Sequence, residues 1–424
     1  MEEQNPYEKF VANNGSNHAI HDMVFPQSIY ANRKTFITYM GKNNSPCITF
    51  YDHVSHCWSD IITPVDNPLG GSDPHGAPAI ALTKDGRICL FYGSHGSPQK
   101  FIRSKYPYEI TGWDLLPDLL PRATYPYPFR LKDGSIIVLG RKGLYQSPWF
   151  EMISRDDGNT WSSPRDIISF FPLGLFASFL IGSDGQSIHC TFTHDDTRFQ
   201  YEWQNRRHCF YVKRDPDGLW RNAAGEKIST PLDVETAFNQ CLLWRTNPLK
   251  SSNVGSLGVD QNNQPYMVFI DGFIEEMEFS LQLARWKEDH WDIHEIARTD
   301  DVFDNKIAIF PRSNGDIDVF LIAGGTDKTF FKRGGNIQLW KSADLGETWK
   351  KGKDIITYEE TKQVYIDVQP VLNGQPDGEI IFCDWHHADP APGVKPTQED
   401  RAFRPNDYTH RIYLYGELGF VRRD

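Results

Sequence analysis

The sequence predicts an all-β fold, a seven-bladed β-propeller with Asp-box turns that forms one domain over residues 1–424. Three observations lead to this prediction: a turn-and-strand unit that repeats along the chain, a second series of hairpins that contain Trp, and a composition rich in aromatic residues, Gly and Pro. Such a composition favours many short strands and turns over long helices. Closed all-β folds often reach this length as one domain.

The repeating unit is a tight turn between an apolar strand and a second strand rich in β-branched and aromatic residues. Asp-Gly and Asn-Gly supply the positive φ angles that a short hairpin needs. Seven copies of the turn indicate seven blades. The clear copies lie at Asp85-Gly86, Asp133-Gly134, Asp184-Gly185 and Asp377-Gly378, and the weaker ones at Asn32, Asn262-Asn263 and Asn314-Gly315.

The second series of hairpins runs out of phase with the first, so the two series together predict four-stranded blades. Two of these hairpins are Asp-boxes, over residues 154–161 and 342–349, in which Asp and Gly shape the turn and Trp packs between blades. We expect both boxes to be structural. The longest interval between turns predicts an insertion around residues 221–245. The Trp residues of the series are Trp58, Trp113, Trp161, Trp220, Trp291 and Trp349.

The overall composition argues against several classes of protein. A net charge of −12 argues against a nucleic-acid partner, and no apolar run is long enough to span a membrane. The first residues are neither basic nor apolar, which predicts a cytoplasmic protein as the sequence stands, and a periplasmic or secreted one if the N-terminus was trimmed. Seven scattered Cys predict reduced, mostly buried thiols. We expect a monomer.

Polar side chains gather at the strand ends of two neighbouring blades, where propellers place their ligands. His75 precedes one inner strand and His95 follows the next, so the hairpin between them brings the two side chains together. The next blade brings Tyr125 and Arg141 together in the same way. The sequence therefore predicts one cluster of two His, a Tyr and an Arg as the catalytic site.

The stretch from residue 100 to 142 is locally basic, which suits an anionic ligand on an otherwise acidic protein. An Arg side chain is the natural partner of a carboxylate. The stretch contains Lys100, Arg103, Lys105, Arg122, Arg130, Lys132, Arg141 and Lys142 against Glu109, Asp114, Asp118 and Asp133. As substrate-binding residues we take Arg103, Arg122, Tyr127, Arg130 and His208.

These residues carry a resemblance to a known family. The phrase Asp-Pro-His-Gly-Ala-Pro-Ala-Ile, followed by Phe-Tyr-Gly-Ser-His-Gly and by the Tyr125 and Arg141 pair, resembles the active-site motif of propeller polysaccharide lyases with BNR or Asp-box repeats. These are the ulvan lyases and the L-rhamnose-α-1,4-D-glucuronate lyases that act on arabinogalactan and gum arabic. The repeats resemble the family over nearly the whole chain, and the motif covers residues 71–143.

The resemblance implies β-elimination at C4 of a uronate within an oligo- or polysaccharide, above all the release of L-rhamnose from a terminal glucuronate. In this chemistry the carboxylate is neutralised first, which suits Arg141. A base then removes the C5 proton and an acid protonates O4. In D-glucuronate both lie on one face of the sugar, so Tyr125 is a candidate for both steps, with His75 and His95 sharing the work. The reaction requires no cofactor.

Two other classes of function stay open. A hydrolase of the sialidase type would need an Arg triad and a Tyr–Glu nucleophile pair; the sequence has no clear Arg triad, and Phe129-Arg130-Leu131 is only weakly similar to the first Arg motif of sialidases. An exo-α-L-rhamnosidase would use a His on the opposite face, for which His18 or His21 is a candidate. A non-catalytic glycan-binding propeller would use exposed aromatic and polar contacts, with Trp149, Trp203, Trp385, His386 and His387 as candidates.

A separate group of His and Cys is a candidate structural metal site, although its spacing fits no standard zinc pattern. Its members are His189, Cys190, His194, His208 and Cys209.

Overall fold

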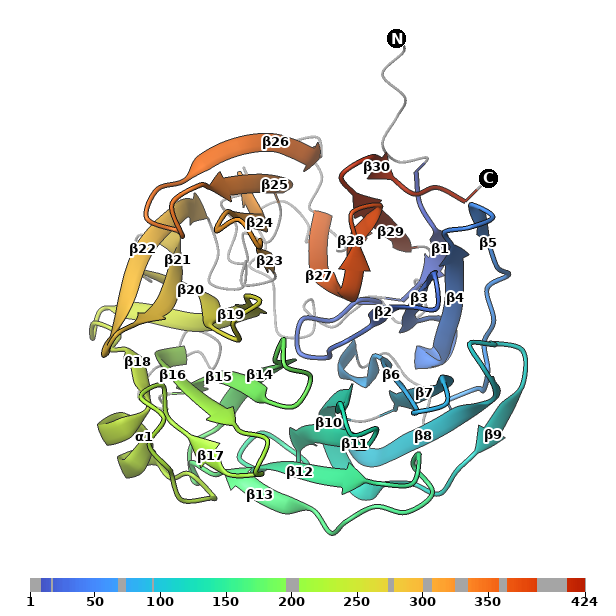
Figure 1. Cartoon of the computed structure of the whole chain (residues 1–424), viewed down its shortest axis with the longest axis horizontal. Coiled ribbons are helices and arrows are strands. Elements are labelled where there is room, and N and C mark those ends of the chain that lie inside the picture. The colour runs from blue at the N-terminus through green and yellow to red at the C-terminus, as the bar shows by residue number, and fades with distance from the viewer. Residues whose placement is uncertain are drawn as a thin grey trace, which may run out of the picture.

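The computed structural model describes residues 9–16, 18–67, 74–93, 95–195, 206–273, 278–299, 307–324, 335–357, 364–386 and 410–423. In this part of the chain, antiparallel sheets stand side by side around a central axis, with their first strands innermost (Figure 1). The arrangement is a β-propeller, so the predicted all-β class is confirmed.

The strands pair largely in chain order, from the axis outward. The first sheets contain β2 (Ser28–Ala31), β3 (Lys34–Met40), β4 (Pro46–Asp52) and β5 (Cys57–Trp58); β6 (Ala79–Leu82), β7 (Arg87–Tyr92), β8 (His95–Pro107) and β9 (Trp113–Leu115); and β10 (Leu120–Arg130), β11 (Ile136–Arg141), β12 (Trp149–Ser154) and β13 (Arg165–Ile168).

The remaining sheets follow the same order. They contain β14 (Leu175–Ile181), β15 (Ile188–Asp195), β16 (Arg206–Arg214) and β17 (Trp220–Arg221); β19 (Lys250–Val259), β20 (Pro265–Phe273), β21 (Glu278–Lys287) and β22 (His290–Thr299); β23 (Ala308–Pro311), β24 (Ile317–Gly324), β25 (Gly335–Ser342) and β26 (Lys350–Ile356); and β27 (Val364–Gln375), β28 (Gly378–His386) and β29 (His410–Gly416), with β30 (Gly419–Phe420) paired to β29.

The two ends of the chain meet in one sheet. β1 (Ala12–Gly15) pairs antiparallel with β29, with Ala12 opposite Ile412 and Gly15 opposite His410. Figure 1 shows β1 beside β29. The N-terminal strand therefore supplies the outer strand of the C-terminal sheet and closes the ring with backbone hydrogen bonds.

The core lies between the sheets, and this explains why many strands are apolar on both faces. In β7, Ile88 and Leu90 pack into one apolar cluster, whereas Cys89 and Phe91 pack into another. Because successive side chains of a strand point to opposite faces, a strand between two neighbouring sheets must bury every residue.

Three of the four clear Asp-Gly turns adopt the expected backbone, whereas Gly378 of the fourth begins β28 without a positive φ angle. Gly86, Gly134 and Gly185 have φ angles of +91°, +92° and +70°, which residues with a Cβ rarely adopt. These turns join the two innermost strands of their sheets, so they all lie at one end of the central channel.

The Asp-boxes are structural, as expected. Asp156 accepts hydrogen bonds from the backbone N–H (2.8 Å) and hydroxyl (2.7 Å) of Thr160 and from Ser154 Oγ (2.9 Å). A Cβ on Gly158 would lie 2.7 Å from Phe101, a residue of the preceding sheet. The ring of Trp161 meets the Phe101 ring edge-on at 5.9 Å. The box therefore joins two sheets at the outside of the propeller.

The predicted insertion contains a short helix, α1 (Val234–Gln240), and β18 (Leu242–Trp244), which pairs with β16. Asp233 begins the helix by accepting a hydrogen bond from Thr236 N–H at 2.8 Å. In the described part of the chain, no helix has the length and apolar character needed to cross a membrane.

Candidate active site

The two predicted histidines lie face to face at the end of the channel opposite the Asp-Gly turns. His75 lies in a short 3-10 turn (Pro74–Gly76) before β6, and His95 begins β8. Their rings stack with centroids 4.0 Å apart and planes at 21°. The β6–β7 hairpin thus brings them together in the way that the sequence predicts.

Tyr125 joins this pair from the next sheet. Its ring centroid lies 5.7 Å from that of His75 and 6.4 Å from that of His95. Its backbone has a φ angle of +58°, at a bulge where the register of β10 against β11 shifts. Bulges and positive φ angles at bulky residues are uncommon, and they aim side chains at functional sites.

Thr124 ties the two sheets together beneath this cluster. It lies opposite both His95 and Arg141 in the strand pairing. Its hydroxyl accepts a hydrogen bond from Gly96 N–H at 2.9 Å and donates one to the carbonyl of Gly143 at 2.6 Å. The relative position of the His pair and the Tyr–Arg pair is therefore set by backbone pairing.

Arg141 lies at the end of β11 and is 2% exposed. Its Cζ lies 4.8 Å from the Tyr125 ring centroid. Its Nε and Nη1 atoms are buried and have no hydrogen-bond partner in the described part of the chain. Burial lowers the pKa of Arg141, and Tyr125 and Asp195 oppose that shift. A buried guanidinium with two unused donors is suited to an anionic ligand.

These four residues line a cavity of about 430 Å³ together with side chains that the sequence did not single out. Asp195 ends β15 and Arg206 begins β16, so they occupy strand ends on the next sheet. The same strand-end argument would have found both. The additional lining residues are Leu144, Tyr145, Phe176, Asp195 and Arg206.

The additional polar residues are held in place by specific contacts. Tyr145 donates its hydroxyl hydrogen to Asp195. The guanidinium of Arg206 lies 3.9 Å from the Phe176 ring centroid and donates to Asn253 Oδ1 at 2.9 Å. The cavity thus contains two guanidinium groups, two imidazoles and two phenols around one carboxylate.

His21 belongs to this cluster, which corrects the prediction of an opposite-face hydrolase site. Its ring centroid lies 5.3 Å from that of His75 and 6.0 Å from that of Tyr125. Burial lowers the pKa of His21 to about 3, despite the opposing charge of Asp22. The ring centroid of His18, the other candidate, lies 5.4 Å from that of His21, and its Nδ1 atom lies 2.8 Å from Oδ2 of Asp367.

Three of the five predicted substrate-binding residues lie away from the cavity. Arg103 donates to the carbonyl of Asp157 at 2.5 Å and to Asn159 Oδ1 at 3.1 Å, so it supports the first Asp-box. Arg130 lies at the opposite end of β10 from the cluster and lines a different cavity. Tyr127 is buried; its hydroxyl donates to the carbonyl of Ala177, and burial raises its pKa.

The other two lie nearer but outside the cavity lining. Arg122 is exposed and donates to the carbonyl of Gly96 at 3.0 Å, next to His95. The ring of His208 lies 5.4 Å from that of His194 and 4.9 Å from that of Phe238.

The locally basic stretch does not form a single patch. Lys100 pairs with Asp118 at 2.9 Å, and Lys142 pairs with Asp166 at 2.6 Å. Its other members spread over both ends and the outside of the propeller, because a strand carries its residues from one end to the other. The basic residues of this stretch therefore do not gather around one anionic ligand, and among them only Arg141 lines the active-site cavity.

The other candidate residues do not form second sites among the described residues. Trp149 is fully buried beneath Tyr125, and Trp203, His387 and the side chains of Trp385 and His386 lie outside the described part. No group of three metal-ligating side chains occurs among the described residues. His189 instead bonds Tyr211 at 2.7 Å and Asn263 at 3.1 Å, and burial lowers its pKa to about 4.

The fold and this cluster define a β-propeller with a cationic, histidine-rich site at one mouth of its channel. The chain belongs to the BNR repeat-containing family, whose model matches residues 34–299.

Individual proteins resemble the chain over most of its length. An ulvan lyase of Nonlabens ulvanivorans is 23% identical, with 98% of this chain and 90% of that protein covered. A solved ulvan lyase structure from a new polysaccharide lyase family is 20% identical, with 98% of this chain and 97% of that chain covered and a TM-score of 0.81. The same coverage and TM-score hold for that enzyme bound to -[GlcA(1-4)Rha3S]-. The predicted resemblance to propeller polysaccharide lyases is confirmed.

Proposed function

We propose that this protein cleaves an ulvan-type polysaccharide by β-elimination at C4 of a glucuronate. The observation that carries the proposal is Arg141, whose two unpartnered nitrogens lie beside Tyr125 and the stacked pair of His75 and His95. A uronate carboxylate can accept hydrogen bonds from both of these nitrogens. Once its charge is neutralised in this way, the uronate can undergo elimination.

Each residue has a role that follows from its position. Arg141 binds the carboxylate and stabilises the enolate-like charge that develops when the C5 proton leaves. Tyr125 acts as a phenolate beside that cation, takes the proton from C5 and so becomes a neutral phenol. The electron pair of the C5–H bond forms the C4–C5 double bond, the C4–O4 bond breaks with its electrons on O4, and Tyr125 or a His protonates O4. His75 and His95 orient the sugar and share the transfer.

The comparisons favour ulvan over the terminal rhamnosyl-glucuronate that the sequence first suggested. The relatives are named ulvan lyases, and one solved relative is bound to -[GlcA(1-4)Rha3S]-. Both substrates lose the group on O4 of a glucuronate, so the cluster serves either one. Arg206 gives the cavity a second cation, which supports a substrate that carries more than one negative charge.

The proposed architecture has seven blades in one domain over residues 1–424. The strand pairing supports the count, because each group of strands given above forms one four-stranded antiparallel unit, with β1 completing the last.

The test is an elimination assay. Purified protein is incubated with ulvan and, separately, with a rhamnose-capped glucuronide, and absorbance at about 235 nm is followed as the conjugated product forms. We expect absorbance to rise with ulvan. A rise with the capped glucuronide alone would restore the first substrate prediction. Reducing ends without absorbance from either substrate would contradict elimination.

A further inference from the structure

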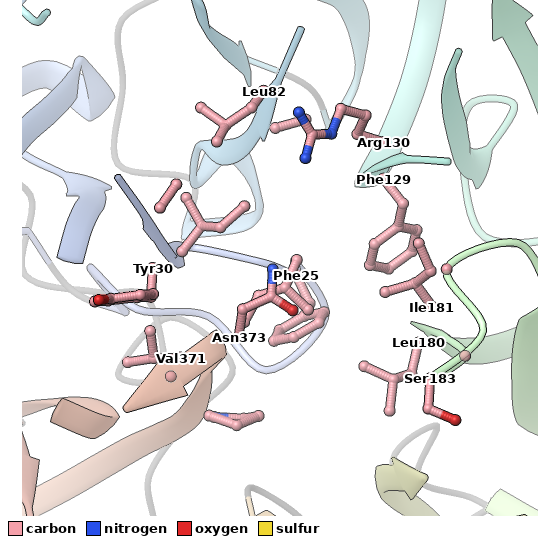
Figure 2. Close-up of a pocket in the computed structure, with 18 of the residues that line it drawn as sticks. Phe25, Tyr30, Leu82, Phe129, Arg130, Leu180, Ile181, Ser183, Val371 and Asn373 are labelled. Carbon is pink, nitrogen blue, oxygen red and sulfur yellow. The ribbon is translucent and has the colours of Figure 1, made fainter. Parts of the chain in front are cut away.

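A second, larger cavity lies at the other end of the channel. It has a volume of about 940 Å³ and is formed where the Asp-Gly turns of the inner hairpins meet. Figure 2 shows side chains from several sheets facing this space, among them Arg130, Ser183 and Asn373. Phe25 lines it on the side toward the active site, so residues 18–27 separate the two cavities.

The repeated turns place hydrogen-bond donors around this cavity. In the Asp-Gly turns, the residue before Asp lines the space: Lys84 and Lys132 in two adjacent sheets and Ser183 in the next. On the other side, Asn32 lies in the turn between β2 and β3, and Asn373 lies near the end of β27. The sequence feature that builds the blades thus also gives the cavity a polar rim.

The carboxylates of these turns do not neutralise the lysines. Asp85 accepts from Arg87 Nε at 2.9 Å, and Asp133 accepts from Ser135 N–H at 2.8 Å. Asp184 accepts from the backbone N–H of Gln186 at 2.7 Å. Each carboxylate is therefore occupied within its own turn, and hydrogen bonds lower the pKa of all three, with desolvation opposing them.

The cavity is lined by cations without acids, in a chain of net charge −12. Its lining residues, all of which are described, include Lys84, Arg130, Lys132 and Arg312 but no Asp or Glu. Only Arg312 is paired with carboxylates, with Asp318 at 2.9 Å and Glu379 at 2.6 Å. Lys84, Arg130 and Lys132 come from neighbouring sheets, so their charges lie on one side. A concave site lined by charges of one sign focuses the electrostatic potential, and positive charges therefore attract an anion into it.

The remaining lining offers apolar and aromatic surface. Leu82, Phe129 and Val371 face the space in Figure 2, and Tyr30, Tyr108 and Phe310 also line it. Aromatic rings with polar neighbours provide both the faces and the hydrogen bonds that a sugar uses.

We propose that this turn-end cavity is a second, non-catalytic binding site for an anionic oligosaccharide that carries sulfate or carboxylate groups. Its volume is near the top of the range, about 300–1,000 Å³, of sites that enclose small ligands. Such a site would retain a polymeric substrate at a distance from the active site and raise its local concentration. The inference depends on the proposed function only for the choice of polysaccharide.

The test measures binding by calorimetry, using size-fractionated sulfated ulvan oligosaccharides and the Arg141→Met protein, in which the active site has lost its main anion contact. Adding Lys84→Gln and Lys132→Gln should weaken the remaining binding by about tenfold or more and reduce its salt dependence. The matched control adds Lys105→Gln and Lys227→Gln, which remove the same charge from exposed positions away from both cavities. In the otherwise wild-type protein, the Lys84 and Lys132 changes should leave kcat on short substrates unaltered.

Equal affinity in the two triple variants, one with the Lys84 and Lys132 changes and one with the Lys105 and Lys227 changes, would overturn the proposal. Binding of inorganic sulfate as tight as that of the oligosaccharide, lost in the same variant, would show a small-anion site and overturn the saccharide assignment. If the wild-type protein cleaves no ulvan but the Lys84 and Lys132 changes still reduce oligosaccharide binding, the proposed function is wrong and the turn-end site remains.

Discussion

Replacing Arg141 with Met separates its functional role from any structural one. The substitution removes the charge and keeps most of the side-chain volume at a position that is 2% exposed. The two buried nitrogens without a partner are the ones available to a substrate carboxylate. Hydrogen bonds to a charged group contribute about 1.5–3 kcal/mol each, so losing two should cost about 3–6 kcal/mol, or about 10²–10⁴ in kcat/KM.

The same substitution should not destabilise the protein. A buried cation with unsatisfied donors carries a desolvation cost, which an apolar side chain of similar volume avoids. We therefore expect the free energy of unfolding, measured by urea titration, to stay the same or rise. Initial rates with ulvan at several concentrations give kcat and KM separately. A variant with a lower unfolding midpoint and with kcat/KM within tenfold of wild type would show that Arg141 is structural.

Three further predictions follow from the described contacts. Tyr125→Phe should reduce kcat by about 10²–10⁴ with KM nearly unchanged, because only a proton-transferring hydroxyl is lost; a variant that keeps more than about a tenth of the wild-type rate would rule out that role. Asp156→Asn should lower Tm and leave kcat unaltered, because Asp156 only holds its Asp-box together; a loss of kcat at unchanged Tm would contradict this. The unfolding midpoint in urea should decrease as pH falls from about 6.5 toward 4, because the unfolded chain protonates His21 and His189 while the fold holds their pKa values near 3 and 4; a midpoint that stays level over this range would refute the argument.

The candidate site could be predicted because it depends on local pairing. A hairpin fixes which residues face each other across its open end, and this brings His75 to His95 and Tyr125 to Arg141 without knowledge of the whole ring. The count of basic residues along the chain did not predict which of them line the cavity, because it took no account of the end of the strand at which each residue lies. Arg130 and Tyr125 lie on the same strand, yet they face cavities at opposite ends of the channel.

The place of His21 could not be predicted, because it depends on contacts between the two ends of the chain. Gln369 of β27 donates to the carbonyls of His21 at 2.5 Å and Val24 at 2.7 Å. Gln27 accepts from His21 N–H at 2.6 Å. These buried amides hold residues 18–27 in the channel, where His21 contacts the candidate site and Phe25 lines the other cavity. No local pattern in the sequence indicates that this segment lies in the channel.

The central claim is that the cluster of Arg141, Tyr125 and the two histidines performs an elimination. The most direct measurement compares, for the same ulvan digest, the number of reducing ends with the absorbance of the unsaturated uronate. Elimination predicts one conjugated double bond for every glycosidic bond broken, and loss of both signals in Tyr125→Phe. Reducing ends that accumulate without the double bond would contradict it and identify the enzyme as a hydrolase.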